Sequence, residues 1–324
     1  MTMTSARTAG GTKQGVILSG AVRDVYSREI LFFAQPSLVF AQFVDRRTEL
    51  NAEPGDTIKF TKYFDVEGDA LLSEVENITV TNIAAHQVHI AVQEYGKGIS
   101  QSERLIRTAW DDVRARSVLL LGQHYGRTVD TLIQNHFRSA GSLRTVIVGG
   151  HANRAALTAT DTMDVQSIKD AVEILAVEKA PGINGSYVCV VHPHVARGLR
   201  DDSEWIEAHK YTQPGVNNIY RGEIGMMEGV RFVQTTNVAV IDKSGNVLND
   251  RKDTGENQAV YNSSYEVYQS PLFGANAVGW AEALPVQFRM DDSDDFGRTR
   301  KLAWYSIMGA GQIRPENSTI IESI

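Results

Sequence analysis

The sequence is poor in cysteine and in long apolar runs. Its 324 residues include one cysteine, Cys189, so no disulfide can form within the chain. Cys189 lies in the apolar run Tyr187–Val191, where an inert buried thiol is far commoner than a nucleophile. No apolar stretch approaches the roughly 18 residues of a membrane span, and Met1–Gln14 lacks the apolar centre of a secretory signal. We therefore expect a soluble protein from a reducing compartment, with no membrane partner.

Motifs for catalysis and for nucleotide or calcium binding are missing as well. Gly149-Gly150 lacks both the Lys-Ser/Thr of a P-loop and the third glycine of a dinucleotide fingerprint. The acidic run Asp291–Asp295 fails the EF-hand pattern, because positions 6 and 12 are Phe296 and Leu302. The net charge of −7 disfavours tight binding of nucleic acid, which needs clustered Lys and Arg. These absences favour a non-enzyme with no cofactor.

One pair of histidines offers a metal-site alternative. His192 and His194 could both bind a metal, with His209 or Asp201 as the third ligand. The plainer interpretation is a strand-to-helix turn, in which Pro193 takes the first helical position. We favour the turn.

An extended arm is the first notable feature that is present. Apolar and polar residues alternate in Gly55–Phe64 and again in Val88–Val92, which predicts two paired strands. About 20 polar and acidic residues separate them. A two-stranded arm is marginal in water on its own, so we expect it to lie on another surface. That requirement suggests assembly rather than catalysis.

A long helix is expected directly after the arm. Ser100-Gln101-Ser102-Glu103 has the form of a capping box, which predicts one helix from there to Phe137, about 55 Å long. Gly122 and Gly126, four residues apart, should either kink it or admit another backbone closely. Its apolar face is predicted to comprise Ile106, Trp110, Val113, Leu121, Tyr125, Val129 and Leu132.

The charges of the arm and the helix are opposite in sign. No Lys or Arg occurs from Tyr63 to Gly96. Five acidic residues crowd the central part of this stretch, namely Asp65, Glu67, Asp69, Glu74 and Glu76. Arg104, Arg107 and Arg114 share one face of the expected helix. Two ordinary solvated surfaces would explain this pattern. The sharper hypothesis is that the acidic arm of one subunit lies on the basic helix face of a neighbour.

The rest of the chain mixes helices and strands without regular alternation, which predicts an α+β fold. Helices are expected over Val22–Gln35, from the cap Asp164 through Leu175, from Pro193 through Leu199, and after the cap Ser203. Strands are expected at Ser186–Val191, in Gly222–Asn237 with a turn at Gly229, in Val267–Leu284 with breaks at Pro271 and Gly274, at Leu302–Ile307, and from Ile313 on. Loops are expected at residues 139–161, in the polar insertion Ile241–Glu256, and at the exposed, acidic Phe288–Asp295.

The order of these features resembles the major capsid proteins of tailed bacteriophages with the Hong Kong 97-type fold, and most closely the branch typified by phage N-four. The segments that carry the resemblance are Pro54–Phe60, Gln93–Gly96, Thr128–Leu132, Tyr187–Pro193, Leu199–Trp205, Gly222–Phe232 and Ser270–Ala275. The resemblance implies five regions. They are an N-terminal arm (1–35), an extended loop with its leading strand (36–99, hairpin about 55–98), a peripheral domain with its spine helix (100–149), an axial domain (150–285, with the insertion at about 241–256), and strands returning to the peripheral domain (286–324).

The resemblance also implies a function and partners. The expected function is a structural subunit that assembles, as hexamers and pentamers, into the icosahedral shell around phage double-stranded DNA. Its expected location is the virion capsid, after synthesis in the bacterial host cytoplasm. Expected partners are other copies of itself and a portal protein, and further candidates are a scaffold, a maturation protease and a decoration protein. DNA would lie nearby without sequence-specific binding. The alternatives are an encapsulin-like cellular compartment and a soluble metal-dependent α+β enzyme using the His192/His194 region.

Overall fold

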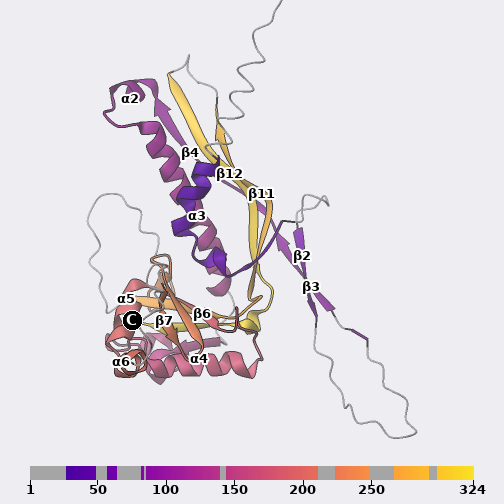
Figure 1. The fold of residues 1–324 in the computed structure, drawn as a ribbon, viewed down its shortest axis with the longest axis vertical. Helices are drawn as coiled ribbons and strands as arrows, with labels where there is room; N and C mark the ends of the chain where they lie inside the picture. Colours follow the sequence, from indigo (N-terminus) through magenta and orange to yellow (C-terminus); the bar gives the residue numbers. More distant parts are fainter. Residues whose placement is uncertain are drawn as a thin grey trace, which may run out of the picture. The chain divides into compact units, whose positions relative to one another are not determined.

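The computed structural model describes most of the chain as two compact units. The described residues are 27–48, 57–63, 82–83, 85–138, 144–210, 223–248, 266–291 and 298–324. The first unit comprises Met1–Leu38, Gln93–Thr128 and Ala283–Met308, and the second comprises Val39–Val92, Val129–Glu282 and Gly309–Ile324. Helices and strands are mixed without regular alternation, which confirms the α+β prediction (Figure 1). No helix of the described segments is both long and apolar enough to cross a membrane.

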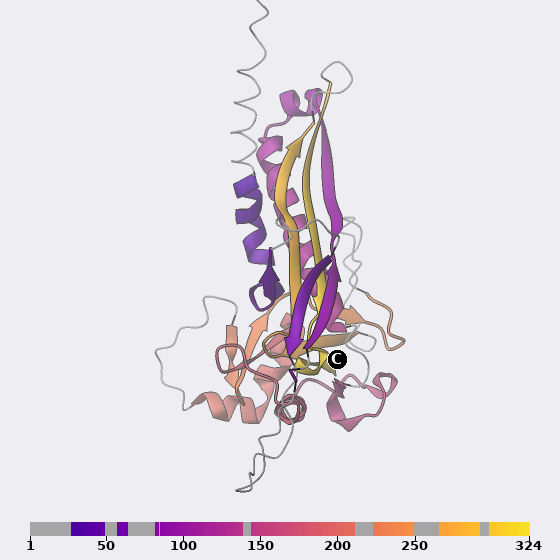
Figure 2. The same cartoon turned by 90° about the vertical axis from the view of Figure 1, so that its right-hand side faces the viewer.

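A four-stranded sheet includes the antiparallel pairing of the first unit and an edge strand, β1 (Asp45–Arg47), that runs parallel to its neighbour. β4 (Gln93–Ser102) pairs with β12 (Thr299–Gln312) along its whole length, from Gln93 opposite Met308 to Ser102 opposite Thr299. β11 (Val278–Met290) lies on the other side of β12, as Figure 2 shows. Trp304 of β12 is buried. Its indole nitrogen donates to His124 Nδ1 at 3.2 Å, and its ring packs edge-on against Tyr125.

Two glycines let a neighbouring helix approach closely in this unit. Residues 27–34 are helical and lead into a 3₁₀ turn, Gln35–Ser37, with proline in its first turn, so the helix ends where the sequence predicts. A Cβ on Gly122 would lie 2.9 Å from the carbonyl oxygen of Ile30, and one on Gly126 would lie 2.8 Å from that of Ala34. The glycines therefore serve close backbone contact rather than a kink.

The predicted single long helix is wrong, because two helices occupy its place. β4 continues through Ser102, and α2 (Glu103–Thr108) begins there, with the Ser102 side chain accepting from Leu105 N. The chain then leaves the helical conformation. Asp112 Oδ1 accepts from the backbone of Arg114 and starts α3 (Val113–Arg138). The 26 residues of α3 span about 39 Å. The Asp112 cap therefore sets where the main helix begins, and the apolar stripe does not.

The second unit is built on a mixed sheet with strand order β5-β13-β10-β6-β8-β7, in which β9 also pairs with β10. Its strands are β5 (Thr145–Ile147), β6 (Tyr187–Val191), β7 (Glu223–Met227), β8 (Val230–Gln234), β9 (Ala239–Ile241), β10 (Val267–Phe273) and β13 (Ser318–Ser323). β10 and β13 are buried at every position. These strands bury polar as well as apolar residues, among them Gln269, Ser270 and Glu322.

Helices of the second unit confirm two local predictions and correct a third. α4 (Val165–Val177) begins with a capping box between Asp164 and Ser167, as the sequence indicates. α5 (Pro193–Asp201) begins with Pro193. α6 (Ser203–Lys210) is capped by Asp202, whose Oδ1 accepts from Glu204 N at 3.0 Å, and not by Ser203. The 3₁₀ turns are Phe40–Gln42, Val148–Gly150, Arg154–Ala156 and Pro315–Asn317.

Several strand predictions also need correction. Pro271 does not break a strand but lies inside β10, between the segment that pairs with β9 and the segment that pairs with β6. The break does occur at Gly274, as predicted. Phe288 is buried in β11 rather than in an exposed acidic loop. The loop prediction for residues 139–161 overlooked β5. The turn at Gly229 is confirmed, with φ of +74°.

The root of the predicted arm is an antiparallel hairpin with a core inside its own subunit. β2 (Thr57–Tyr63) pairs with β3 (Ala85–Ala91) throughout. Its apolar face packs on two residues of the second unit. The cluster consists of Ile58, Phe60, Ile90, Ala281 and Ile313. The expectation that the arm lacks a core is therefore wrong for the described root.

Glycines provide the space that this packing needs. A Cβ on Gly279 would lie 2.9 Å from the Phe60 ring, one on Gly309 would overlap the Ala91 carbonyl oxygen, and one on Gly311 would overlap the Ile90 side chain. Three separate positions therefore admit the hairpin only because they carry no side chain.

We expect Gly309→Ala to lower the free energy of unfolding by about 1–3 kcal/mol, because the added methyl group must displace the β3 backbone. Gly98→Ala is the matched control, since a Cβ there lies 3.5 Å from Leu302 O, an ordinary contact. Denaturant unfolding of both variants checks this. Equal stability of the two would contradict the close approach.

Candidate functional site

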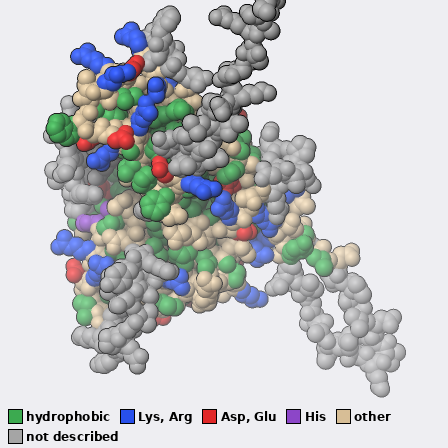
Figure 3. All heavy atoms as spheres, turned by 45° about the horizontal axis from the view of Figure 1, so that its top comes forward, with side chains coloured by type: hydrophobic (Ala, Val, Ile, Leu, Met, Phe, Trp, Pro, Cys, Tyr) green, Lys and Arg blue, Asp and Glu red, His purple; other side chains and the backbone are tan. Residues whose placement is uncertain are grey.

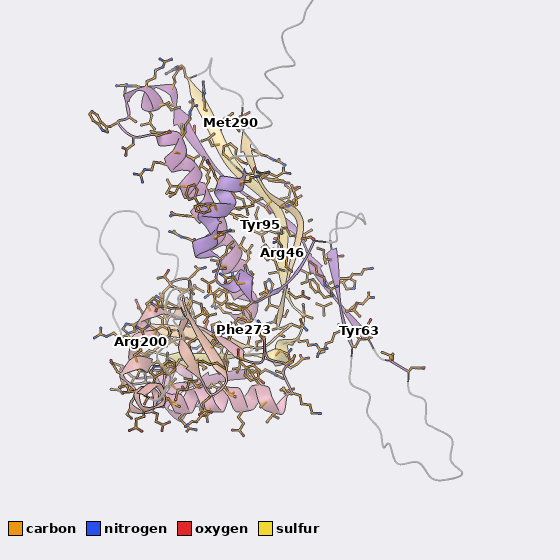
Figure 4. All side chains as sticks on the ribbon, in the orientation of Figure 1. Arg46, Tyr63, Tyr95, Arg200, Phe273 and Met290 are labelled. Carbon is orange, nitrogen blue, oxygen red and sulfur yellow. The ribbon has the colours of Figure 1, made fainter. Side chains whose placement is uncertain are left out.

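The hairpin root is held by charged side chains as well as by its apolar face. Lys62 of β2 forms an ion pair with Glu316. The Arg47 guanidinium lies 4.7 Å above the centroid of the Phe60 ring, a cation–π geometry. Arg314 Nη2 donates to the carbonyl oxygen of Tyr63 at 3.2 Å, at the end of β2 (Figure 4). These contacts hold β2 of the root in place.

The acidic residues of the predicted contact, Asp65, Glu67, Asp69 and Glu74, lie outside the described residues. Their place against a neighbour stays a prediction.

The three arginines do not share a helix face as predicted. Arg104 and Arg107 lie on α2 and Arg114 lies in the first turn of α3, with the break between them. All three are exposed. Arg107 Nη2 contacts Glu103 at 2.8 Å, and its hydrogen bond lowers the pKa of that carboxyl. Figure 3 shows Lys and Arg side chains with a few acidic ones over the α2 surface. Exposed pairs of this kind contribute little stability.

Trp110 was placed on the apolar helix face by the sequence periodicity, and that placement is wrong. It lies in the break between α2 and α3, and its side chain is fully exposed. The helical spacing of apolar residues continues across the break, so this spacing does not reveal the break. The Asp111-Asp112 pair, as a possible helix cap, is the sequence signal that could have revealed it.

His192 and His194 form a cap rather than a metal site. His192 Nδ1 accepts from His194 N at 3.2 Å, and both rings stack on Tyr268. His192 is buried. Within the described segments, no three potential metal ligands come together. Burial raises the pKa of the nearby Cys189 thiol far above its usual range, so it stays protonated.

Asp130 is a buried carboxylate that the sequence analysis missed. It lies on α3 with its side chain fully buried, and its two oxygens accept from Val39 N at 2.9 Å and Phe40 N at 3.2 Å. Burial raises its pKa to about 7, against the lowering effect of hydrogen bonds from the Val39–Ala41 backbone and Asn237. A lone aspartate on a helix gives no sequence signal of partners 91 positions away.

A second buried polar group ties the end of α3 to the sheet. Glu322 of β13, almost fully buried, accepts from Arg154 Nη2 at 2.6 Å and from Gln269 Nε2 at 2.8 Å. Arg138, the last residue of α3, donates to Gln269 Oε1 at 2.8 Å. A buried carboxylate needs such partners, so this network is structural and leaves no reactive group.

Comparison with known proteins identifies relatives of the whole fold. Residues 39–321 match the family model described as phage capsid protein. The capsid of Ralstonia phage GP4 is similar in structure, with TM-score 0.69, 18% identity and 86% of each chain covered. The capsid of cyanophage P-SCSP1u is also similar, with TM-score 0.64 and 16% identity, and the match covers 89% of this chain and 88% of the other. The capsid of cyanophage Pam1 has TM-score 0.64 and 14% identity, and the match covers 87% of this chain and 88% of the other. No curated protein sequence matches significantly.

Asp130 should make stability depend on pH. Its folded pKa of about 7 lies above the ordinary 3.8, so the folded state binds the proton more tightly between these values. Stability relative to Asp130→Asn should therefore fall as pH rises from about 4 to 7, by at most about 1.4 kcal/mol per unit. Asn imitates the protonated carboxyl but does not titrate, so it lacks this pH dependence. Denaturant unfolding across that range measures it. The exposed Asp291→Asn is the control, and parallel curves for wild type and Asp130→Asn would refute the assignment.

Proposed function

The chain belongs to the phage capsid protein family, and from this premise we propose that its subunits associate as the hexamers and pentamers of an icosahedral shell. The protein is a major capsid protein with the Hong Kong 97-type fold, a structural component of the virion and not an enzyme. The observation that carries the proposal is the family match over residues 39–321, nearly the whole chain.

The regions expected from the sequence provide the proposed parts of the subunit. The spine helix is α3, the root of the extended loop is the β2–β3 hairpin, and the sheet around β10 and β13 is the core of the axial domain. The first compact unit, with Gln93–Thr128 and Ala283–Met308, supports a peripheral domain that the chain leaves and re-enters. The boundary within α3 falls after Thr128, earlier than the 149/150 boundary expected from the sequence.

We keep the charge contact between neighbouring subunits as part of the proposal. Asp65, Glu67, Asp69 and Glu74 of one copy would face Arg104, Arg107 and Arg114 of the next. The break between α2 and α3 means that two short segments would supply the basic side. Arg107 is already paired with Glu103, so Arg104 and Arg114 would provide most of the free charge. Such a contact guides register more than it adds affinity.

The proposed partners beyond the shell itself are double-stranded DNA and a portal protein. Further candidates are a scaffold, a maturation protease or a decoration protein. The net charge of −7 suits a wall that encloses DNA without gripping it. The same proposal includes synthesis in the bacterial host cytoplasm. It also assigns the protein to the phage N-four-type branch of the capsid proteins. The family match favours a phage shell over an encapsulin-like compartment.

Expression of the full chain tests the proposed assembly. We expect particles that elute in the void volume of a sizing column and appear as closed shells by negative-stain microscopy. Nuclease-protected DNA in particles from infected cells would support the phage assignment, and an enclosed cargo enzyme would support the compartment. A small discrete oligomer as the sole product would overturn the proposal.

Reversing the arm charges should block assembly and leave the subunit folded. We expect Glu67→Lys with Asp69→Lys to abolish shells, because two repulsive charges would then face the arginines, while thermal unfolding of the free subunit stays unchanged. Asp170→Lys with Glu173→Lys on α4, both exposed, alters net charge equally and serves as control. Adding Arg104→Glu and Arg114→Glu should restore shells. Normal assembly of the arm variant would disprove the contact.

A further inference from the structure

The turn between α2 and α3 carries an unusual exposed side chain. Trp110 is 101% exposed, while Trp205, Trp280 and Trp304 are at most 5% exposed. These are all four tryptophans of the chain. Tryptophan has the largest apolar surface of any side chain, and exposed aromatic anchors mark interaction sites. Leu105, 46% exposed, lies on the preceding helix, so Trp110 is not the sole apolar side chain on this surface.

The turn is held rigidly at both ends, although its tip is free. Glu103 N donates to Arg298 O at 2.7 Å, which fixes the start of α2 to the strand end. Gln101, buried at the end of β4, donates to Val113 O at 3.1 Å and to Ser117 Oγ, which fixes the start of α3. Asp112 caps α3. A rigid mount lowers the entropic cost of binding through the side chain that it displays.

The charges around Trp110 point to the kind of partner. Exposed charges of both signs flank it. Arg104 and Arg107 precede it, and Asp111, Asp112 and Arg114 follow it. A nucleic acid would favour one sign alone. A surface that carries both signs suits a protein partner whose surface charges are also mixed, and a second copy of this chain is such a partner.

We propose that Trp110 is an apolar anchor which becomes buried against a neighbouring copy of this chain when subunits assemble. The inference rests on the proposed shell function, because that function supplies the second copy. Residues at the centre of such contacts carry most of the binding energy, and aromatic side chains dominate among them.

Trp110→Ala tests the anchor through assembly. The free subunit should unfold at an unchanged temperature, because the side chain has no contacts to lose. The subunit concentration needed for shell formation should rise about tenfold or more. Val177→Ala at the end of α4, 74% exposed, is the control and should assemble as wild type. Assembly of Trp110→Ala at the wild-type concentration would overturn the proposal.

Tryptophan fluorescence gives a second readout, independent of assembly strength. On passing from free subunits to shells, wild-type emission should shift to shorter wavelength and resist acrylamide quenching, because Trp110 leaves water. Trp110→Phe keeps an apolar ring and should still form shells, but it should lack this change. Shells in which Trp110 stays quenchable would refute the anchor while leaving the shell function intact. Failure of the wild type to form any shell would refute both.

Discussion

A two-stranded hairpin has one apolar face and no second layer of its own, and the structure depends on how that face is covered. Ile58, Phe60 and Ile90 lie on Ala281 and Ile313, and the hairpin approaches this closely because Gly279, Gly309 and Gly311 carry no side chain. The root therefore belongs to the folded subunit, and its direction is set before any neighbour is met. If the root were not fixed, each contact of the arm would cost more conformational entropy, and repeated weak contacts would add less free energy.

The segment that precedes the hairpin is fixed by a different kind of contact. In the first unit, the helix at residues 27–34 meets α3 where Gly122 and Gly126 allow close backbone contact. In the second unit, Asp130 accepts hydrogen bonds from Val39 and Phe40. The first contact gains from dispersion over a close surface, and the second satisfies backbone donors that would otherwise be buried without partners. α3 contributes to both, which explains why small residues and a buried acid recur on one helix.

The sequence predicted those features whose causes are local. Alternation in the hairpin strands, the aspartate cap of α4 and Pro193 at the start of α5 each depend on neighbours a few residues away. The misses have long-range causes. Pro271 is tolerated inside β10 because its partners β9 and β6 change at that point, and Asp130 finds its partners 91 residues away. The α2–α3 break was local and still missed, since Trp110 and Val113 continued the helical spacing across it.

Energies divide between the inside of the subunit and its surface. Within the described chain, the large apolar side chains of β10 and β13 are buried, so the fold does not need a neighbour to hide its core. The exposed ion pair Arg107–Glu103 contributes little free energy, so pairs of this kind are too weak to join subunits. In the proposed shell, charges would therefore orient copies, and the energy of association would come from apolar area that water still covers in the single subunit. A fully exposed tryptophan on a rigid turn is the largest such area in one residue, and a contact repeated around a closed shell multiplies even a modest gain.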